Sequence, residues 1–262
     1  DATDAIPRST SRLQAPPANL SLKLQMVSTL QINKVPTAIV YCEGNFGKFD
    51  GKTANGLIRH SQAYRIVSVI DSSHNRQDSG QILDDVINNI PIFGNLKAAV
   101  VHERKVPDTF IYGMAPSTGK LSSQDRIVIL DAIAMGMNIV SRLHEYLSED
   151  AEIAAFASKH DVTSRDIRKP RQSKDMRLFD RSIKNVNAVR IAVLGTDCAI
   201  SKRTTATVLA RALNAKGIKT VLVGTGQTGL MQGAKYGVAM DAVPPQFCCG
   251  ELEGAIVAAS KT

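Results

Sequence analysis

The sequence contains no tryptophan, and aromatic residues make up only 5% of its 262 positions. Its four cysteines are Cys42, Cys198, Cys248 and Cys249. None of them forms a CxxC pair, so the pattern excludes a typical zinc site and a disulfide framework, and we expect reduced thiols. No apolar run reaches the ~20 residues that a membrane-spanning helix needs. These absences predict a cytoplasmic globular protein with no membrane partner.

The positive charge of the chain is large but dispersed. Lysine and arginine number 32 against 24 for aspartate and glutamate, which gives a net charge of +8. Such a charge suggests nucleic acid as a partner, but the scattered basic residues and the few aromatics argue against it, and we predict no nucleic-acid partner. The densest basic stretch is typical of a solvated linker or of a surface for an anionic substrate. Its members are Arg168, Lys169, Arg171, Lys174, Arg177, Arg181 and Lys184.

The order of the hydrophobic segments predicts an α/β fold. From Val35 onward, short apolar runs alternate with longer helical stretches, as in a parallel sheet covered by helices. The expected strands are 37–42, 65–70, 109–112, 138–140, 189–194 and 220–223, with a further edge at 91–94. The expected helices are 52–61, 82–88, 122–135, 148–159 and 202–216, and the serines expected to cap two of them are Ser122 and Ser148. The apolar face expected for helix 122–135 consists of Ile127, Leu130 and Ala134.

Residues 188–211 predict a phosphate-binding loop. A β-branched run ends at Gly195, a short polar turn follows, and a helix begins at Lys202. Backbone N–H groups, the positive end of a helix and a lysine together attract phosphate. The loop departs from G-x-x-x-x-G-K-[ST] by one extra residue, by Ser201 in place of the second glycine and by Arg203 before the hydroxyl. The expected cofactor-binding residues are Gly195, Thr196, Asp197, Cys198, Ala199, Ser201, Lys202, Arg203, Thr204 and Thr205.

Within this loop, Lys202 is expected to contact phosphate oxygens and to take part in catalysis. Thr204 or Thr205 could ligate Mg²⁺, and Thr204 is the metal ligand that we expect. The plainer alternative is a tight β–α turn with a surface lysine. The next loop, 224–229, has three glycines interleaved with hydroxyl groups at the end of an expected strand, where open α/β sheets bind ligands. Its expected binding residues are Gly226, Gln227 and Thr228, with a mobile turn as the alternative.

Three further features have weaker interpretations. Residues 44–53 imitate a second phosphate loop, but their spacing does not fit the pattern and a plain connection is favoured. His144 lies beside Glu145 and is a candidate for catalytic proton transfer, with a hydrogen-bonded structural histidine as the alternative. Asp241, Glu251 and Glu253 could coordinate a metal or water, although a single carboxylate is more often only solvated.

Several short sequence motifs, which we call sequence words, occur in a specific order along the chain. They are KTANGLIR at 52–59, LHEYL at 143–147, DIRKP at 166–170, GTDCA at 195–199, KRTT at 202–205, GQTG at 226–229 and DAV at 241–243. Together they resemble a family catalogued as a domain of unknown function, whose members include D-glutamate N-acetyltransferase. The loop is also similar to that of dethiobiotin synthetase, an ATP-dependent enzyme. Ser201 and Arg142 stand where this family usually has glycine, and Gln246 stands where it has aspartate.

The resemblance implies a Rossmann-like domain followed by a P-loop domain. We expect a flexible leader at 1–35, the Rossmann-like domain at 36–167, a linker at 168–187 and the P-loop domain at 188–262. The P-loop domain is expected to be incomplete, because similar proteins continue with further strands, so either the chain is truncated or another chain supplies them. A homo-oligomer is also expected.

The resemblance leads to three functional hypotheses. The first is an acyltransferase that moves an acetyl group from acetyl-CoA to the amine of a small acidic amino acid. In it, the Lys202 loop grips the phosphates of coenzyme A, Arg168 and Lys169 attract the acidic substrate, and His144 is a candidate base. The second is a ligase in which ATP and Mg²⁺ activate a carboxylate. The third is a degenerate nucleotide-binding regulatory module.

Overall fold

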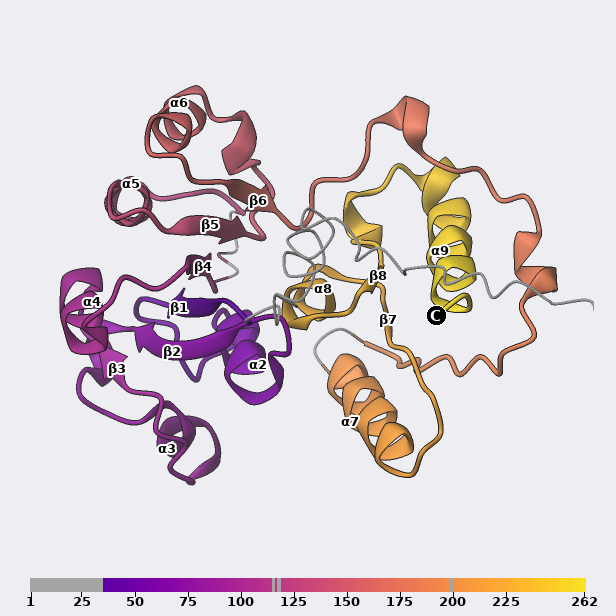
Figure 1. Cartoon of the computed structure of the whole chain (residues 1–262), viewed down its shortest axis with the longest axis horizontal. Helices are drawn as coiled ribbons and strands as arrows, with labels where there is room; N and C mark the ends of the chain where they lie inside the picture. The colour runs from indigo at the N-terminus through magenta and orange to yellow at the C-terminus, as the bar shows by residue number, and fades with distance from the viewer. Residues whose placement is uncertain (1–34, 115, 117–118, 198–199) are drawn as a thin grey trace, which may run out of the picture. The chain divides into compact units, whose positions relative to one another are not determined.

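The computed structural model describes residues 35–114, 116, 119–197 and 200–262, so that the expected leader lies almost wholly outside the described residues. These residues belong to one compact unit, Val35–Thr262 (Figure 1). Its strands are β1 (Thr37–Tyr41), β2 (Arg65–Ile70), β3 (Ile92–Phe93), β4 (Thr109–Tyr112), β5 (Asn138–Ser141), β6 (Ser164–Asp166), β7 (Val223–Gly224) and β8 (Tyr236–Gly237). Its α-helices are α2 (Lys52–His60), α3 (Ser79–Asp84), α4 (Leu96–Glu103), α5 (Ser123–Ala134), α6 (Ala151–Lys159), α7 (Lys202–Ala215), α8 (Gln227–Gln232) and α9 (Pro245–Ala259). Short 3₁₀ turns are η1 (Ser72–His74), η2 (Leu147–Glu149), η3 (Ser173–Asp175), η4 (Ser182–Asn185) and η5 (Met240–Ala242).

A six-stranded parallel sheet confirms the predicted α/β fold. Its strand order is β3-β2-β1-β4-β5-β6, so the order reverses between β1 and β4. Helix α4 packs against β2 and β3, and α5 packs against β5. Because all six strands are parallel, the residues that follow β1, β4, β5 and β6 meet at one edge of the sheet, which we call the carboxyl edge. Open α/β sheets bind their ligands at this edge.

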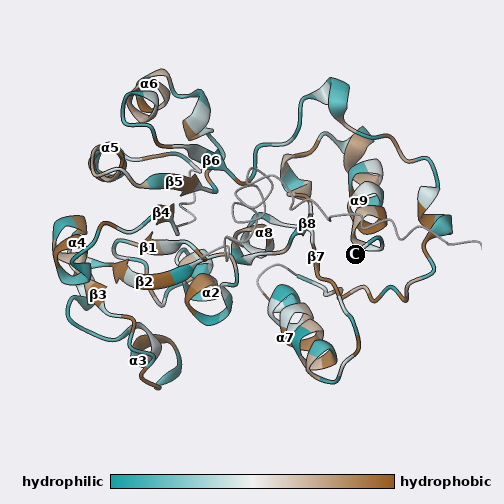
Figure 2. Ribbon diagram, in the orientation of Figure 1, coloured by the Kyte–Doolittle hydropathy of each residue, from teal (hydrophilic) through white to brown (hydrophobic). Residues whose placement is uncertain are grey.

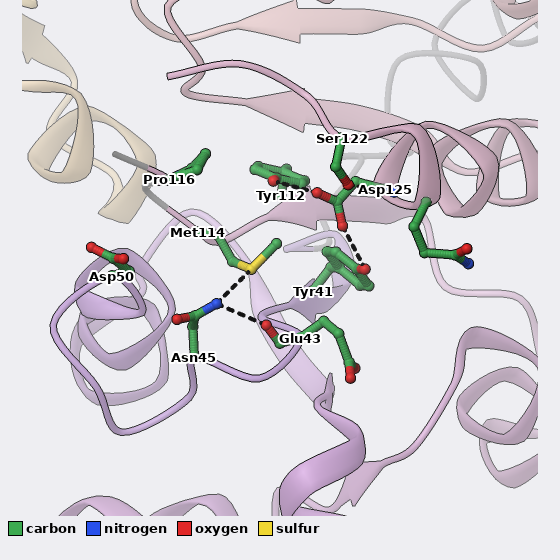
Figure 3. A pocket seen from close by; sticks show the side chains of 10 residues that line it. Tyr41, Glu43, Asn45, Asp50, Tyr112, Met114, Pro116, Ser122 and Asp125 are labelled. Carbon is green, nitrogen blue, oxygen red and sulfur yellow. Dashed lines mark hydrogen bonds between the residues drawn. The ribbon is translucent and has the colours of Figure 1, made fainter. Parts of the chain in front are cut away.

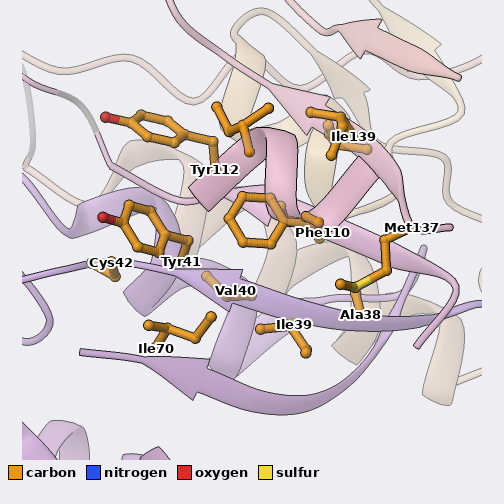
Figure 4. Packing of buried hydrophobic residues seen from close by; sticks show 14 of the residues in the cluster. Ala38, Ile39, Val40, Tyr41, Cys42, Ile70, Phe110, Tyr112, Met137 and Ile139 are labelled. Atoms are coloured by element: carbon orange, nitrogen blue, oxygen red, sulfur yellow. The ribbon is translucent and has the colours of Figure 1, made fainter. Parts of the chain in front are cut away.

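The core of this sheet consists of the short apolar runs read from the sequence (Figure 4). Ala38, Ile39 and Val40 on β1 and Phe110 and Ile111 on β4 are fully buried. Strands covered on both faces read as continuous apolar runs, which explains why no polar alternation marks them. No helix of the described residues is both long and apolar enough to cross a bilayer.

Two helix predictions need correction at their starts. Helix α3 begins after Asp78, whose carboxylate accepts the N–H groups of Gly80 and Gln81, and it ends at Asp85 with φ 55°, so the prediction 82–88 was displaced. Asp150, and not Ser148, caps α6 by accepting the N–H of Ile153. Both corrections have one cause, since an aspartate carboxylate closer to the first helical turn satisfies its free N–H groups.

Helix α5 begins as predicted but turns a different face to the sheet. Ser122 caps it by accepting the N–H of Asp125. The predicted apolar face was wrong, because Ile127 and Ala134 are exposed and Leu130 is only partly buried. The buried residues are Ile129, Ala132 and Ile133. Helix 123–134 is apolar around much of its circumference, so that spacing alone did not select the face.

The second half of the chain departs most from its predicted strands. Residues 189–194 form no strand, and Val189 is 90% exposed. Of the strand expected at 220–223, only Val223 is extended and paired, in the short parallel pair β7–β8. Helix α7 agrees with the prediction and is followed by Gly217 at φ 77°. Figure 2 shows that α7 mixes hydrophilic and hydrophobic residues along its length.

Candidate functional site

The predicted phosphate loop surrounds the start of α7. Lys202 is the first helical residue, and its Nζ donates a hydrogen bond to the carbonyl oxygen of Asp197. Ser201, at the N-cap position, makes no side-chain hydrogen bond to the first turn. A Cβ on Gly195 would lie 2.5 Å from Cδ1 of Ile200, so a larger residue there would have to displace the Ile200 side chain. Cys198 and Ala199, which we expected to bind cofactor, lie outside the described residues, and Thr196 is exposed.

Ser201 adopts a left-handed backbone conformation, which glycine accepts without strain. Its φ is 66°, in the left-handed region that a side chain disfavours by about 1–2 kcal/mol. The N–H of Thr205 donates to the Ser201 carbonyl and opens the helical ladder. The residue before Lys202 is therefore held at a cost in backbone strain.

Arg203 turns away from the loop and packs on α2. Its Nη1 lies 2.7 Å from the position that a Cβ on Gly56 would occupy, and this nitrogen has no hydrogen-bond partner in the part of the chain that the structure describes. Burial lowers the pKa of Arg203. Thr204 is half-buried and Thr205 is exposed. Among the described residues, no group of three or more His, Cys, Asp or Glu side chains is placed to hold a metal ion, so metal binding by Thr204 stays a prediction.

Two of the sequence words, together with the residue just before a third, meet at one point through their polar side chains. The hydroxyl of Thr53 at the start of α2 lies 3.2 Å from that of Thr228 in the first turn of α8. Nη1 of Arg142, the residue directly after β5, donates to the same Thr53 oxygen at 3.2 Å. Gln232 at the end of α8 also donates to the Gly56 carbonyl with its Nε2. The second glycine loop therefore leads into α8, whose residues contact α2.

A second group of side chains lies beside this point, and we call Arg142, His144, Arg168 and Asp241 the guanidinium cluster. Nη1 of Arg168 donates to Nε2 of His144 at 2.5 Å, and Nη2 of Arg168 lies 3.4 Å from Oδ2 of Asp241. Arg142 and Arg168 are only 9% and 5% exposed. Burial, and then the charge of Arg168, lower the pKa of Arg142. The cluster thus places two desolvated cations at the carboxyl edge.

His144 is held as a neutral imidazole. A guanidinium only donates hydrogen bonds, so Nε2 of His144 accepts the bond from Arg168. Burial first, and then the positive charge of Arg168, lower the pKa of His144 below its usual value. Glu145 does not assist it, because its carboxylate accepts the N–H of Leu121 instead. This geometry suits a proton acceptor whose lone pair is shared with Arg168.

Several other predicted groups are held by structural contacts. Nζ of Lys169 lies 3.0 Å from Oγ of Ser148 and 3.1 Å from Oε1 of Glu149, away from Arg168. Glu253 is buried and accepts the N–H groups of Asp180 and Ile183, and Glu251 accepts from Arg171 and from the N–H of Arg177. These two glutamates bind the preceding segment to α9 and are not solvated.

The loop that imitates a second phosphate site is closed by a carboxylate of the protein. Asp71 at the end of β2 accepts the N–H of Gly44 at 3.1 Å and that of Phe46 at 3.0 Å. Burial raises the pKa of Asp71, but hydrogen bonds from Ser73, His74 and Phe46 outweigh it and the net pKa is lowered. An anionic carboxylate occupies these amides, which argues against a phosphate loop at 44–53, although Asp50 of this segment lines the cavity described next.

A cavity of about 330 Å³ opens where the strand order reverses, and the sequence reasoning missed it (Figure 3). Tyr41 at the end of β1 donates to Asp125 Oδ1 at 2.7 Å, and Tyr112 at the end of β4 donates to Asp125 Oδ2 at 3.0 Å. Burial is the main reason that the pKa values of both tyrosines are raised. Glu43 and Asp50 also line the cavity. The signal for it was the polar residue at the end of each central strand.

Comparisons with known proteins agree with this architecture. A model described as "Domain of unknown function (DUF1611_N) Rossmann-like domain" matches residues 72–170. A second, "Domain of unknown function (DUF1611_C) P-loop domain", matches residues 177–262. The chain belongs to the DUF1611 family. The Rossmann-like and P-loop domains expected from the sequence words are thereby confirmed.

Relatives of this DUF1611 protein include two named D-glutamate N-acetyltransferase. One is from Tritonibacter scottomollicae, 33% identical over 145 residues, and one is from a Pseudoalteromonas species, 34% identical over 146 residues. Each match covers 55% of this chain and 42% of the relative, which is less than half of the relative's length. The crystal structure of a DUF1611 family protein from Anabaena variabilis is similar with a TM-score of 0.76 and 27% identity, over 87% of this chain and 64% of that chain.

Proposed function

We propose that this DUF1611 protein is an acyltransferase that moves an acetyl group from acetyl-CoA to the amine of an acidic amino acid, with D-glutamate as the first candidate. The reaction is suggested by the names of its relatives. Within the chain, the supporting observation is the guanidinium cluster, in which one of two desolvated guanidinium groups contacts a neutral imidazole. An acidic amino acid offers carboxylates to the guanidinium groups and an amine to the imidazole.

The Lys202 loop would hold the phosphates of coenzyme A in this reaction. Its fit is supported by the start of α7, where Ser201 makes no side-chain cap, and by a lysine whose described partner is a neutral carbonyl. A phosphate would give that lysine a charged partner. Acetyl-CoA, when bound, supplies the acetyl thioester.

His144 would accept the proton that the substrate amine must lose. The amine nitrogen then attacks the acetyl carbonyl, the C–N bond forms, the C–S bond breaks, and the thiolate leaves and takes up a proton. The lowered pKa keeps His144 neutral down to a pH below its ordinary value. Because Nε2 accepts from Arg168, Arg168 has to turn toward the substrate before this nitrogen can receive a proton.

Two product assays test the proposal on the same protein. We expect free coenzyme A thiol to appear from acetyl-CoA only when D-glutamate is present, and no inorganic phosphate to appear from ATP and Mg²⁺. Lys202→Ala should lose the thiol release and the thermal stabilisation by acetyl-CoA. Lys216→Ala, an exposed lysine just after α7, is the matched control.

Other outcomes of these assays overturn the proposal. Phosphate released once per turnover would support a ligase that uses ATP, with Thr204 holding Mg²⁺. Binding of coenzyme A or nucleotide without turnover would support a regulatory module, and Ser201→Gly would then restore no activity.

A further inference from the structure

The two arginines of the guanidinium cluster lack the partners that buried guanidinium groups need. Nη1 of Arg142 donates to the Thr53 hydroxyl, and Nε of Arg142 has no hydrogen-bond partner among the described residues. Arg168 uses Nη1 on His144, and within the same part of the chain its Nε is also without a partner. Both residues are more than nine-tenths buried. A buried charge with unmet hydrogen bonds is costly unless an opposite charge joins it.

The charge of the cluster is not balanced from within. The charged groups that act on Arg142 are Arg168, which repels it, and Asp241, which attracts it. Asp241 faces two guanidinium groups with one carboxylate, lies 3.4 Å from Arg168 and is 50% exposed. Lys169 is engaged with Glu149 and adds nothing to the balance. One positive charge is therefore in excess at a desolvated point of the carboxyl edge.

We propose that Arg142 and Arg168 bind the side-chain carboxylate of the acidic substrate, which takes the place of Asp241. The identity of the ligand rests on the proposed function, whereas carboxylate binding is measurable without it. The planar fork of a guanidinium matches the two oxygens of a carboxylate. The exposed side chains of His144 and Asp241 form the rim through which the ligand enters.

This assignment gives Arg142 a role in specificity. Arg168 leaves His144 when it binds the carboxylate, and this movement frees Nε2 of His144 for the substrate amine. Arg142 supplies the second cation and is fixed by Thr53, which also contacts Thr228. Binding of the substrate carboxylate would thus also free His144, the proton acceptor, from Arg168.

Calorimetric titration of the whole chain with D-glutamate and D-glutamine, without acetyl-CoA, tests the site. The two ligands differ only in the side-chain carboxylate. We expect D-glutamate to bind at least tenfold more tightly, and Arg142→Gln to abolish this preference. Arg142→Lys should keep part of it, because the charge remains but the fork is lost. Arg65→Gln, an exposed arginine at the opposite edge of the sheet, is the control that keeps the preference.

Asp241→Asn should change the carboxylate affinity in the opposite direction to Arg142→Gln. This variant tests the proposal even if Arg142→Gln does not fold. Removing the resident carboxylate should tighten binding of glutarate, which has no amine to acylate. Weaker or unchanged glutarate binding in Asp241→Asn overturns the proposal, as does equal affinity of the native chain for D-glutamate and D-glutamine. Inorganic phosphate that displaces glutarate more strongly than acetate does would show a phosphate site and equally overturn it.

The site and the proposed function can fail separately. Carboxylate binding that depends on Arg142, with no acetyl transfer to D-glutamate, would contradict the proposed function. The proposed carboxylate site would still stand. Acetyl transfer in which Arg142→Gln keeps the preference for D-glutamate over D-glutamine would contradict the site alone.

Discussion

The sheet region, 37–166, and the P-loop region, 188–262, use similar apolar segments in different ways. Ile139 on β5 is fully buried between β4 and β6, whereas Ile191, in an equally β-branched segment, is 63% exposed and unpaired within the described residues. The difference shows that β-branched residues favour an extended chain only where neighbouring strands cover them. A strand is a property of the sheet as much as of its own segment.

The two regions also build their glycine loops differently. In the sheet region, Gly44 and Gly47 take φ values of 64° and 78° without strain, since glycine has no Cβ. In the P-loop region, Ser201 takes φ 66° with a side chain. The first loop binds a carboxylate of the protein, and the second presents Lys202. Backbone strain is therefore found in the loop that the sequence predicts to bind phosphate.

A matched pair of Ile→Ala substitutions should show the largest difference in stability between the two regions. Ile139→Ala removes a fully buried side chain and is expected to cost about 2–5 kcal/mol of unfolding free energy. Ile191→Ala removes an exposed side chain and should change it by less than about 0.5 kcal/mol. Urea denaturation of both variants measures the difference. Equal losses would mean that 189–194 is packed in solution, contrary to the contrast drawn above.

The next effect tests the contact that joins the regions. A Cβ in Gly56→Ala would lie 2.7 Å from Nη1 of Arg203 and 3.0 Å from Nε2 of Gln232. Because both atoms end flexible side chains, displacing them should cost about 1 kcal/mol relative to the control variant, measured by thermal denaturation. Gly229→Ala is the control, because the nearest atom to its Cβ is 3.8 Å away. A variant at Gly56 as stable as the control would show that α2 and α7 are not in close contact.

Relief of the strained loop should stabilise the P-loop region. Ser201→Gly removes the Cβ from a left-handed residue and is expected to raise the unfolding free energy by about 1 kcal/mol. Ser260→Gly is the control, since Ser260 has a right-handed φ of −69° and glycine gains nothing there. Denaturant titration compares the two, and a loss of stability in Ser201→Gly would contradict the strain argument.

The smallest effect concerns acid stability in the sheet region. Hydrogen bonds from Arg126 first, and then from the N–H of Ile153, lower the pKa of Asp150 to about 2. The folded carboxylate releases its proton more readily than the unfolded one, so its stabilisation is present at neutral pH and is lost as the pH falls from about 4 to about 2. Asp150→Asn should flatten the dependence of the melting temperature on pH over that range. The corresponding change in unfolding free energy is below about 1 kcal/mol.

Asp161→Asn provides the control for the acid experiment. Asp161 is exposed at φ 55°, a conformation that asparagine also accepts. A pH profile for Asp150→Asn that matches both this control and the unmodified protein would show that the pair with Arg126 does not stabilise the fold.

The sheet was predictable because its strands are short, apolar and buried on both faces. Positions 65–70 and 109–112 agree with β2 and β4, and the start of α5 at Ser122 agrees as well. Residues 189–194 could not be predicted, since their conformation depends on pairing with distant segments. The apolar face of α5 failed for a related reason, because several faces of that helix are apolar.

The candidate site was predictable by its parts but not by its assembly. Lys202, His144 and Thr228 stand out in the sequence, and the family resemblance orders them. That Thr53, Arg142 and Thr228 share a contact follows only from the fold, since α8 packs on α2. Asp125 lies in the first turn of α5, and its role as acceptor for two phenols depends on β1 and β4 lying side by side.

The position of β1 has a consequence for synthesis of the protein on the ribosome. This strand is the first of the sheet to be made, yet one of its two hydrogen-bonded neighbours is β4, whose last residue, Tyr112, is translated about seventy positions later, and such delayed non-local pairing slows folding. Until then, one edge of an apolar strand stays open to other nascent chains. Pauses in translation before position 112 would therefore lengthen the interval in which aggregation competes with completion of the sheet.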